Sequence, residues 1–347
     1  MHKLRAFLFF TLVMIIIEPL AIEGQTETIQ TKIEKSIKAL ESKDKEIRKK
    51  SMGWLCSFAM QAYNDKEIIK LYKPLKAFIN ALKDENPLIR EDAVLIIGVA
   101  GDKKVMKDIA VMRNDTNKYV QNAAELAMGM LGDNNAFKPL IEMLENKNED
   151  EFYREYAAKA LGRLKNPEAT EPLLLALEDD GVGVTNAARE SLVLIGLETL
   201  NPLMEEFSNK NYIIRANAAF IIKVIYSKAW DTKSETLLKK LEITVEPLIR
   251  LLNDESEKVR YVAALALEYC WDERAIEPLI RARGDISADV RNQAWKSLMR
   301  FRFHESTVNT LIDILESGEK TMKEFAFKVL ETIDTPEAKK AVEKYRK

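Results

Sequence analysis

A pair of short amphipathic helical patterns recurs along the chain with a period of just over 30 residues, and this repeat limits the possible folds more than any other feature. The clearest copy runs from Val245 to Asp272. Its first half places Val245, Leu248 and Leu251 on one helical face, and a second apolar face begins at Val259 after a polar turn. Neither helix is long enough to be stable alone, so each pair must bury its apolar face against neighbouring copies.

Arg260, near the start of the second helix, serves as a reference position for aligning the copies. Its counterparts are Arg48, Arg90, Gln121, Arg154, Thr185, Arg215, Arg291 and Lys323. From Arg90 onward the successive spacings are 31, 33, 31, 30, 45, 31 and 32 residues. From Arg90 onward, the residue three positions after each reference position is an alanine, and the residue seven positions after it carries a larger apolar side chain. Small and large side chains alternating on one face predict helices that pack closely.

A short polar residue lies six residues before most reference positions. The members are Asp84, Asp115, Asn148, Asp179, Asn209, Asp254 and Asp285, with Ser42 and Ser317 in the end copies. We expect such an acceptor to bond the free N–H groups that open the second helix. We also expect the arginine at the reference position to bridge to the carboxylate of the next copy. A row of ligand-binding carboxylates is the alternative interpretation.

The first helices contain interior prolines, namely Pro74, Pro139, Pro172, Pro202, Pro247 and Pro278. In one copy Asn166 is predicted to cap the helix and Pro167 to open it. Pro172 then falls inside the helix and is expected to kink it.

A kinked first helix, an aspartate in the turn, and V-R followed by A-A-x-A-L-G in the second helix together resemble a HEAT repeat of the PBS-lyase-like subtype. The segments that show this best are RNQAWKSL, VRYVAALAL and YREYAAKALGRL. The resemblance covers nearly all of residues 25–347. It implies an all-α fold, a right-handed α-solenoid of about nine helix pairs. Because the family contains scaffolds, adaptors and a few enzymes, it implies only a class of function.

The N-terminus has the pattern of a secretory signal peptide. Lys3 and Arg5 precede an apolar run from Ala6 to Ile17, which is short for a membrane span, and small residues follow. We predict cleavage near residue 24, an extracytoplasmic location (secreted or periplasmic), and no membrane insertion afterwards. The alternative is that the segment stays as an uncleaved anchor.

Charge and residue usage narrow the function further. The chain has 53 basic and 55 acidic residues, a balance that argues against a nucleic-acid partner. Cys56 and Cys270 lie some six copies apart, so we expect two buried thiols and no disulfide. The two histidines are His2 and His304, too few for a catalytic triad or for a metal site built from repeated His-Glu pairs. We therefore predict no cofactor, no metal and no catalytic residues.

One spacing departs from the rest, because the step from Arg215 to Arg260 is 45 residues long. We place an insertion at about residues 227–244, between the sixth and seventh copies. Thr232 and Glu235 have capping-box spacing and should open a short helix. The apolar positions of that helix are Leu237, Leu238 and Leu241.

Beside the insertion, the positions one, five and nine residues after the reference position are apolar. They are Ala216, Phe220, Val224, Tyr261, Leu265 and Tyr269, whereas the fourth and eighth copies carry Glu155, Lys159, Arg163, Asn292, Lys296 and Arg300 there. In the HEAT family the second helices line the concave surface. We therefore predict a partner-binding patch of Phe220, Val224, Trp230, Tyr261, Leu265 and Tyr269.

Two alternatives concern this surface. Trp230 and the leucines of the insertion could fold over the patch and cover it, because apolar surface favours burial. A basic cluster at mid-array is a second candidate site, formed by Lys159, Arg163 and Arg189.

The sequence thus favours a non-enzymatic, exported scaffold or adaptor that binds a protein or peptide on its concave face. The alternative is an enzyme or accessory subunit resembling the bilin lyases. A nucleic-acid glycosylase of the HEAT type ranks last, because it should have a basic concave surface.

Overall fold

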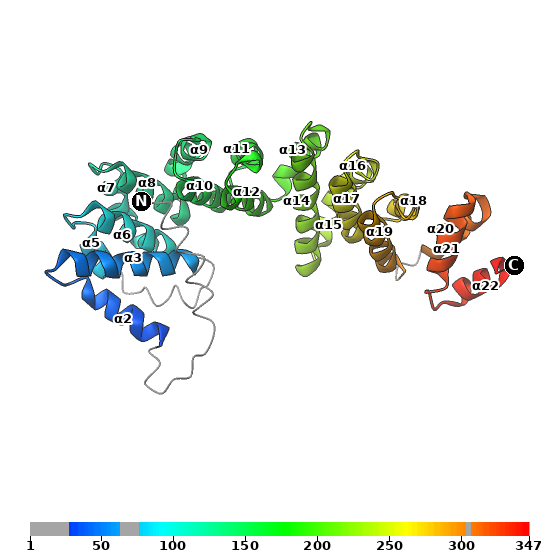
Figure 1. The fold of residues 1–347 in the computed structure, drawn as a ribbon, viewed down its shortest axis with the longest axis horizontal. Coiled ribbons are helices and arrows are strands. Elements are labelled where there is room, and N and C mark those ends of the chain that lie inside the picture. The colour runs from blue at the N-terminus through cyan, green and yellow to red at the C-terminus, as the bar shows by residue number, and fades with distance from the viewer. Residues whose placement is uncertain (1–27, 63–75, 303–306, 347) are drawn as a thin grey trace.

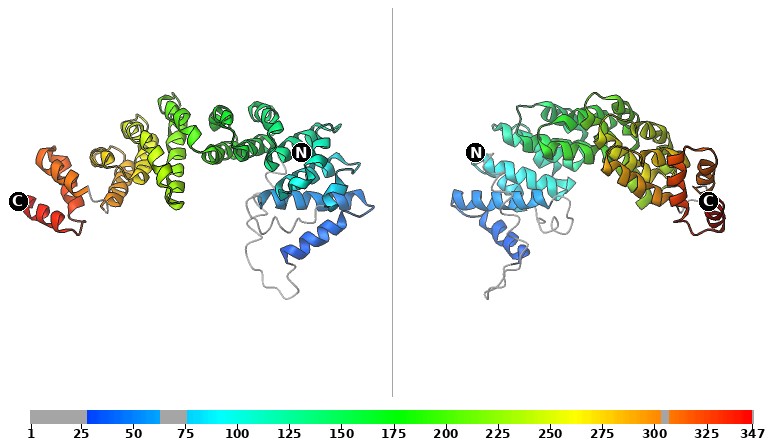
Figure 2. Two further views of the ribbon diagram at one scale, coloured as in Figure 1. Left: turned by 180° about the vertical axis from the view of Figure 1, so that it is seen from behind. Right: turned by 45° about the vertical axis from the view of Figure 1, so that its right-hand side comes forward.

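The computed structural model describes residues 28–62, 76–302 and 307–346. Within these ranges the chain consists of helices and turns, with no strand. The described residues form nine helix pairs that follow one another along an arch, with α2 near one end and α22 at the other (Figure 1 and Figure 2). This arrangement confirms the predicted all-α solenoid.

Each pair consists of a shorter first helix and a longer second helix. The first helices are α2 (Ile29–Ala39), α5 (Lys76–Ala81), α7 (Met106–Met112), α9 (Phe137–Glu145), α11 (Thr170–Leu175), α13 (Leu200–Glu205), α16 (Val245–Leu251), α18 (Ile276–Ala282) and α20 (Thr307–Ser317). The second helices are α3 (Lys45–Gln61), α6 (Pro87–Ala100), α8 (Lys118–Leu131), α10 (Glu151–Leu164), α12 (Val182–Ile195), α14 (Tyr212–Asp231), α17 (Glu257–Cys270), α19 (Ala288–Phe301) and α21 (Lys320–Leu330). From α9 to α19 the first helices lie along the convex edge of the arch and the second helices along the concave side (Figure 1).

The core is the continuous layer between these two rows of helices. All eight alanines three residues after the reference position are fully buried: Ala93, Ala124, Ala157, Ala188, Ala218, Ala263, Ala294 and Ala326. The larger residues four positions later are buried as well, at 2% exposure or less. A small side chain lets the neighbouring helix approach, and the large one fills the space beside it, as predicted.

The prolines predicted to kink the first helices lie instead in the first turn of an α-helix that follows a 3₁₀ turn. Asn166 caps the 3₁₀ turn Pro167–Ala169, as expected, and Pro172 is the third residue of α11. Prolines in the same place are Pro139, Pro202, Pro247 and Pro278. At this position an N–H has no acceptor within its own α-helix, so proline disrupts no bond of that helix. Pro74 lies outside the described residues.

The aspartate six residues before the reference position does not cap the second helix directly. Asp84 Oδ1 accepts from the backbone N–H of Asn86 at 2.9 Å, and the Asn86 side chain in turn caps α6 by accepting from the N–H of Leu88. The cap therefore lies two residues later than predicted. Asp84 shapes the turn and leaves its second oxygen for another partner.

That partner is the arginine of the preceding unit. Five such pairs bridge consecutive units, at shortest N–O distances of 2.7 to 3.0 Å: Arg48–Asp84, Arg90–Asp115, Arg154–Asp179, Arg215–Asp254 and Arg260–Asp285. The same guanidinium also bonds backbone carbonyls of its own turn, as Arg90 Nη1 does at Asp84 O (2.8 Å). The predicted arginine–carboxylate bridge between copies is confirmed.

The series of pairs is interrupted where the sequence lacks both partners. Gln121 faces a copy with Asn148, and Thr185 faces a copy with Asn209; each bonds its own turn, at Asp115 O and Asp179 O. The second interruption falls between α12, which runs along the molecule in Figure 1, and α14, which crosses it. The insertion follows this change of direction.

The insertion lengthens α14 and adds one short helix. Thr232 ends α14 as its C-cap, and Ser234 caps α15 (Glu235–Leu241) by accepting from the N–H of Leu237. The capping residue is therefore Ser234 and not Thr232. Lys233, between them, adopts the left-handed backbone conformation (φ 52°) that lets the chain reverse.

Several predictions fall on parts of the chain outside the described residues. The signal segment, residues 1–24, is one, and the prediction that concerns His304 is another. Among the described residues, no helix is both long and apolar enough to cross a bilayer. Cys56 is buried and Cys270 is half-buried, each with its thiol outside any disulfide, so the predicted burial holds for Cys56 alone.

Candidate partner-binding surface

The predicted patch lies on two adjacent second helices, α14 and α17, which pack against each other. Helix α17 buries Val259, Val262, Ala263, Ala264, Ala266 and Leu267. Its remaining side carries Tyr261, Leu265 and Tyr269, which are half-buried. Because α16 and the neighbouring second helices cover the other sides, this side faces the concave surface.

Helix α14 contributes two further half-buried residues, Phe220 and Val224. Ala216, the first outward position expected there, is instead buried between helices at 3% exposure. We call the set Phe220, Val224, Tyr261, Leu265 and Tyr269 the apolar stripe. Each side chain is anchored on a helix and keeps part of its surface open, the arrangement of a rigid contact surface.

Trp230 lies at one end of the apolar stripe and contacts it through the backbone. Its indole N–H donates to Tyr269 O at 2.7 Å, and its ring lies 5.4 Å from that of Trp271. The side chain remains 39% exposed. Trp230 therefore ties the extended end of α14 to the end of α17.

The leucines of the insertion pack at the C-terminal end of α14. Leu241 is fully buried, and Leu237 and Leu238 are half-buried against the core. The Tyr226 hydroxyl donates to Leu241 O at 2.8 Å and fixes the end of α15. The insertion is thus docked against its own unit.

Cationic side chains border the aromatic members of the stripe. The Lys223 ammonium lies 4.5 Å from the Tyr269 ring centroid and 6.0 Å from that of Phe220. Arg189 on α12 lies 5.9 Å from the Phe220 centroid, and Arg300 on α19 lies 5.9 Å from that of Tyr269. The surface therefore runs across four consecutive second helices, with cations and aromatic rings in alternation.

Sequence reasoning missed Lys223 and did not connect Arg189 or Arg300 with the stripe. Lys223 lies three residues after Phe220 and so occupies the same helical face. The stripe was predicted only from the positions one, five and nine residues after the reference position, and Lys223 is not one of them. The contacts of Arg189 and Arg300 cross between helices, and they become visible only in three dimensions.

The second basic candidate is not brought together as a separate cluster. Lys159 is neutralised by Glu155 at 2.6 Å and lies 4.3 Å from the Tyr156 ring centroid. Arg163 is exposed at the end of α10, whereas Arg189 borders the stripe.

The N-terminal units are joined across their concave side. The Tyr153 hydroxyl of α10 donates to Glu91 Oε1 of α6 at 2.8 Å, and the Tyr156 hydroxyl donates to Met60 O at 3.2 Å. Burial and the adjacent Glu91 carboxylate raise the pKa of Tyr153, so its hydroxyl stays a donor. These contacts span two or more units, and the apolar stripe lies on the later units beyond them.

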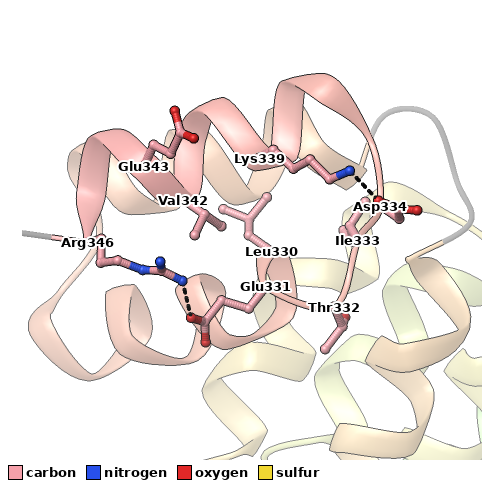
Figure 3. Close-up of a pocket in the computed structure, with 9 residues that line it drawn as sticks. All are labelled: Leu330, Glu331, Thr332, Ile333, Asp334, Lys339, Val342, Glu343 and Arg346. Carbon is pink, nitrogen blue, oxygen red and sulfur yellow. Dashed lines mark ion pairs between the residues drawn. The ribbon is translucent and has the colours of Figure 1, made fainter.

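Hollows within the described residues lie away from the stripe. The first, of about 400 Å³, lies between the end of α21 and α22 (Pro336–Tyr345), with Leu330 and Val342 at its base (Figure 3). Ion pairs Lys339–Asp334 and Arg346–Glu331 border it, at 2.6 and 3.5 Å. The second, of about 440 Å³, lies between α9 and α11 on the convex side. At the first hollow, the charged groups of these two ion pairs thus already have partners.

The described residues contain no group of three or more His, Cys, Asp or Glu side chains placed to hold a metal ion. Burial raises the pKa of the Cys270 thiol to about 12, so it stays protonated and unreactive near neutral pH.

Comparisons with known proteins agree with this architecture. A family model described as HEAT repeats matches residues 75–154, 107–193, 138–223 and 245–330, together more than half of the chain. A search of curated proteins found no match.

Among solved structures, a mutant of Kap121p is 14% identical, with a TM-score of 0.52 over 93% of this chain and 39% of that one. The chain thus spans well under half of Kap121p. The CpcE–CpcF complex of phycocyanin lyase from Nostoc sp. PCC7120 is 19% identical, with a TM-score of 0.36 over 82% of this chain and 98% of that one. At these identities the Kap121p match shows a shared solenoid fold alone.

Proposed function

The chain belongs to the HEAT repeat family, and from that premise we propose that it is a non-enzymatic scaffold or adaptor that binds a protein or peptide on its concave face. The observation that carries the proposal is the apolar stripe on α14 and α17. Five apolar side chains from two adjacent helices keep part of their surface exposed, whereas the next second helix, α19, carries Asn292, Lys296 and Arg300 at the same positions. Apolar surface that faces solvent in one continuous row favours a partner.

The arrangement suits recognition more than catalysis. The stripe residues are fixed by helix packing, so binding costs little side-chain ordering. Tyr and Phe supply large contact areas, and the tyrosine hydroxyls can satisfy polar groups of a partner. A segment lying along the concave face would contact α14 and α17 together.

Substitution within the stripe tests the proposal. Phe220→Asp combined with Tyr269→Asp should abolish capture of the partner by the tagged full chain from its own envelope fraction. Arg250→Asp, at an exposed position of α16 on the convex side, is the matched control and should leave capture unchanged. Helical circular dichroism must stay at the wild-type level in both. Equal capture by the stripe variant would contradict the proposal.

We further propose that the protein works outside the cytoplasm, because residues 1–24 have the pattern of a cleavable signal peptide. Cell fractionation with N-terminal sequencing tests this: a mature N-terminus near Gln25 in the extracytoplasmic fraction is expected. A chain that keeps its first residues and stays with the membrane would favour the anchor alternative. Stoichiometric chromophore or metal in the purified protein would favour the lyase-like alternative over the scaffold.

A further inference from the structure

The cations that border the apolar stripe differ in whether they already have a carboxylate partner. Arg300 donates from Nε to Glu268 Oε1 at 3.0 Å, and Glu268 also accepts from Gln293 at 3.0 Å through its other oxygen. Glu268 therefore already accepts a hydrogen bond at each oxygen. Within the described residues its ion pair is with Arg300 and not with Lys223 or Arg189.

Lys223 has no ion-pair partner among residues 28–62, 76–302 and 307–346. Its ammonium is held over the Tyr269 ring at 4.5 Å, in a half-buried position on α14. Aromatic faces hold a cation in place without neutralising its charge. Lys223 is thus a fixed positive charge in the middle of an apolar surface.

Arg189 is in a similar position on α12. Its one polar contact within the described part of the chain is the side-chain oxygen of Asn186, and its Nε is buried without an acceptor. Its guanidinium lies 5.9 Å from the Phe220 ring centroid, on the side facing α14. Glu190, the next residue, is exposed and forms no ion pair in the described structure.

We propose that the segment bound by the apolar stripe is acidic, with Asp or Glu side chains placed to pair with Arg189 and Lys223 while apolar side chains between them pack on the stripe. The inference rests on the proposed function and specifies its partner. A carboxylate entering here would gain charge-assisted hydrogen bonds in a partly desolvated place, where they are strong. A basic segment would meet two unpaired like charges and be rejected.

The distances of Arg189 and Lys223 from the Phe220 ring limit the spacing of the acidic side chains that could pair with them. Both cations lie about 6 Å from the same Phe220 centroid, so they are no more than about 12 Å apart. In a segment of polyproline II conformation, which has three residues per turn and a rise of about 3.1 Å per residue, side chains three residues apart lie on the same face about 9 Å apart. Acidic side chains three residues apart in such a segment, separated by apolar residues, fall within this limit. A continuous polyphosphate fits less well, because Glu190 and Glu268 lie along the same path.

A peptide series tests the proposal with the purified full chain. The probe is a fluorescein-labelled peptide of about twelve residues, with Glu at every third position and Leu or Phe between, followed by anisotropy. Its counterparts carry Lys in place of Glu, or are a single-stranded oligonucleotide of similar length. The acidic peptide should bind at least tenfold more tightly than either. Arg189→Glu with Lys223→Glu should weaken it at least tenfold and improve binding of the Lys peptide.

Lys258→Glu, an exposed substitution near the start of α17, is the control and should change neither affinity. Tighter binding of the Lys peptide or the oligonucleotide by the wild type would overturn the proposal, as would no binding of the acidic peptide. If the Phe220→Asp, Tyr269→Asp variant loses partner capture but charge reversal has no effect, the stripe is the site and the acidic preference is wrong. If the stripe variant keeps full capture, the proposed function itself fails.

Discussion

Arg154 on α10 binds the carboxylate of Asp179 in the next unit through two nitrogens, Nε at 3.2 Å and Nη2 at 3.0 Å. Lys147 reaches the same carboxylate at 2.8 Å, and the N–H of Gly181 donates to it at 2.9 Å. The Asp179 side chain is only 1% exposed. This is the most buried of the arginine–aspartate pairs that join consecutive units.

Asp179→Asn should lower the free energy of unfolding by about 3 kcal/mol, because it leaves the Arg154 guanidinium with a weaker partner in a mostly buried place. Asp180→Asn changes the adjacent, exposed residue and should cost less than about 0.5 kcal/mol. Urea unfolding followed by circular dichroism measures both. Equal losses of unfolding free energy in the two variants would show that the Arg154–Asp179 pair does not stabilise the fold more than an exposed residue does.

Because of the Asp179 carboxylate, we expect the stability of the folded protein to fall at acid pH. Burial alone would raise the pKa of Asp179, but the hydrogen bonds from Arg154, Lys147 and the Gly181 amide outweigh it and lower the pKa to about 2 from 3.8. Because the folded pKa is the lower one, this stabilisation, about 2 kcal/mol, is present above pH 3.8 and is lost as the pH falls towards 2. The stability gap between wild type and Asp179→Asn should shrink from pH 5 to pH 2. A gap that stays constant or widens would contradict this assignment.

Gly162 lies where two neighbouring second helices, α10 and α12, approach each other closely. A Cβ there would lie 2.5 Å from Cβ and 2.7 Å from Cα of Ser191, whose hydroxyl donates to Ala158 O at 2.8 Å. Gly162→Ala should force α10 and α12 apart and cost about 2 kcal/mol. Gly53→Ala on α3, where the nearest atom is 3.8 Å away, should instead stabilise by about 0.5 kcal/mol. Thermal unfolding of the two variants should shift in opposite directions.

Trp230 should stabilise the insertion more than it serves the partner. Trp230→Phe removes the hydrogen bond to Tyr269 O but keeps a ring against Trp271, and should cost about 1 kcal/mol. Trp230→Ala removes both contacts and should cost about 2 to 3 kcal/mol. Hydrogen exchange across residues 227–244 should speed up in the same order. A loss of capture by Trp230→Phe as large as that of the stripe variant would make Trp230 part of the contact surface.

The repeat made the architecture predictable from the sequence. The spacing of reference positions located each second helix, and the alanines and larger residues that follow proved to be buried. The arginine–aspartate bridges were also predictable, because Arg90 and Asp115 have the same relation in register as Arg260 and Asp285. Where Gln121 or Thr185 replaces arginine, the facing copy has asparagine, so the sequence itself marks the interruptions.

Local turn chemistry was harder to predict. Two polar residues compete for the cap in each turn, and only the backbone shows that Asn86 caps α6 while Asp84 holds the turn. The same ambiguity made Thr232 the expected cap of α15, where Ser234 caps it. Prolines placed by spacing inside a helix fell in the first turn instead, because a 3₁₀ turn precedes each of those α-helices.

The candidate surface was only partly accessible to sequence reasoning. Tyr261, Leu265 and Tyr269 follow from helical periodicity within one helix. The cations depend on distances between helices: Arg189 is far from Phe220 in sequence but lies beside it in space. The link from Tyr153 to Glu91, 62 residues apart, depends on the curvature of the array, which no local pattern fixes.

Site-specific photocrosslinking tests the central claim most directly. A photoreactive amino acid replaces Leu265 within the apolar stripe, or Arg250 on the convex face of the same unit, in cells that produce the full chain. We predict one discrete crosslinked partner from position 265 and none from position 250. Crosslinking from position 250 alone, or the same products from both positions, would contradict a partner site on the concave face of α14 and α17.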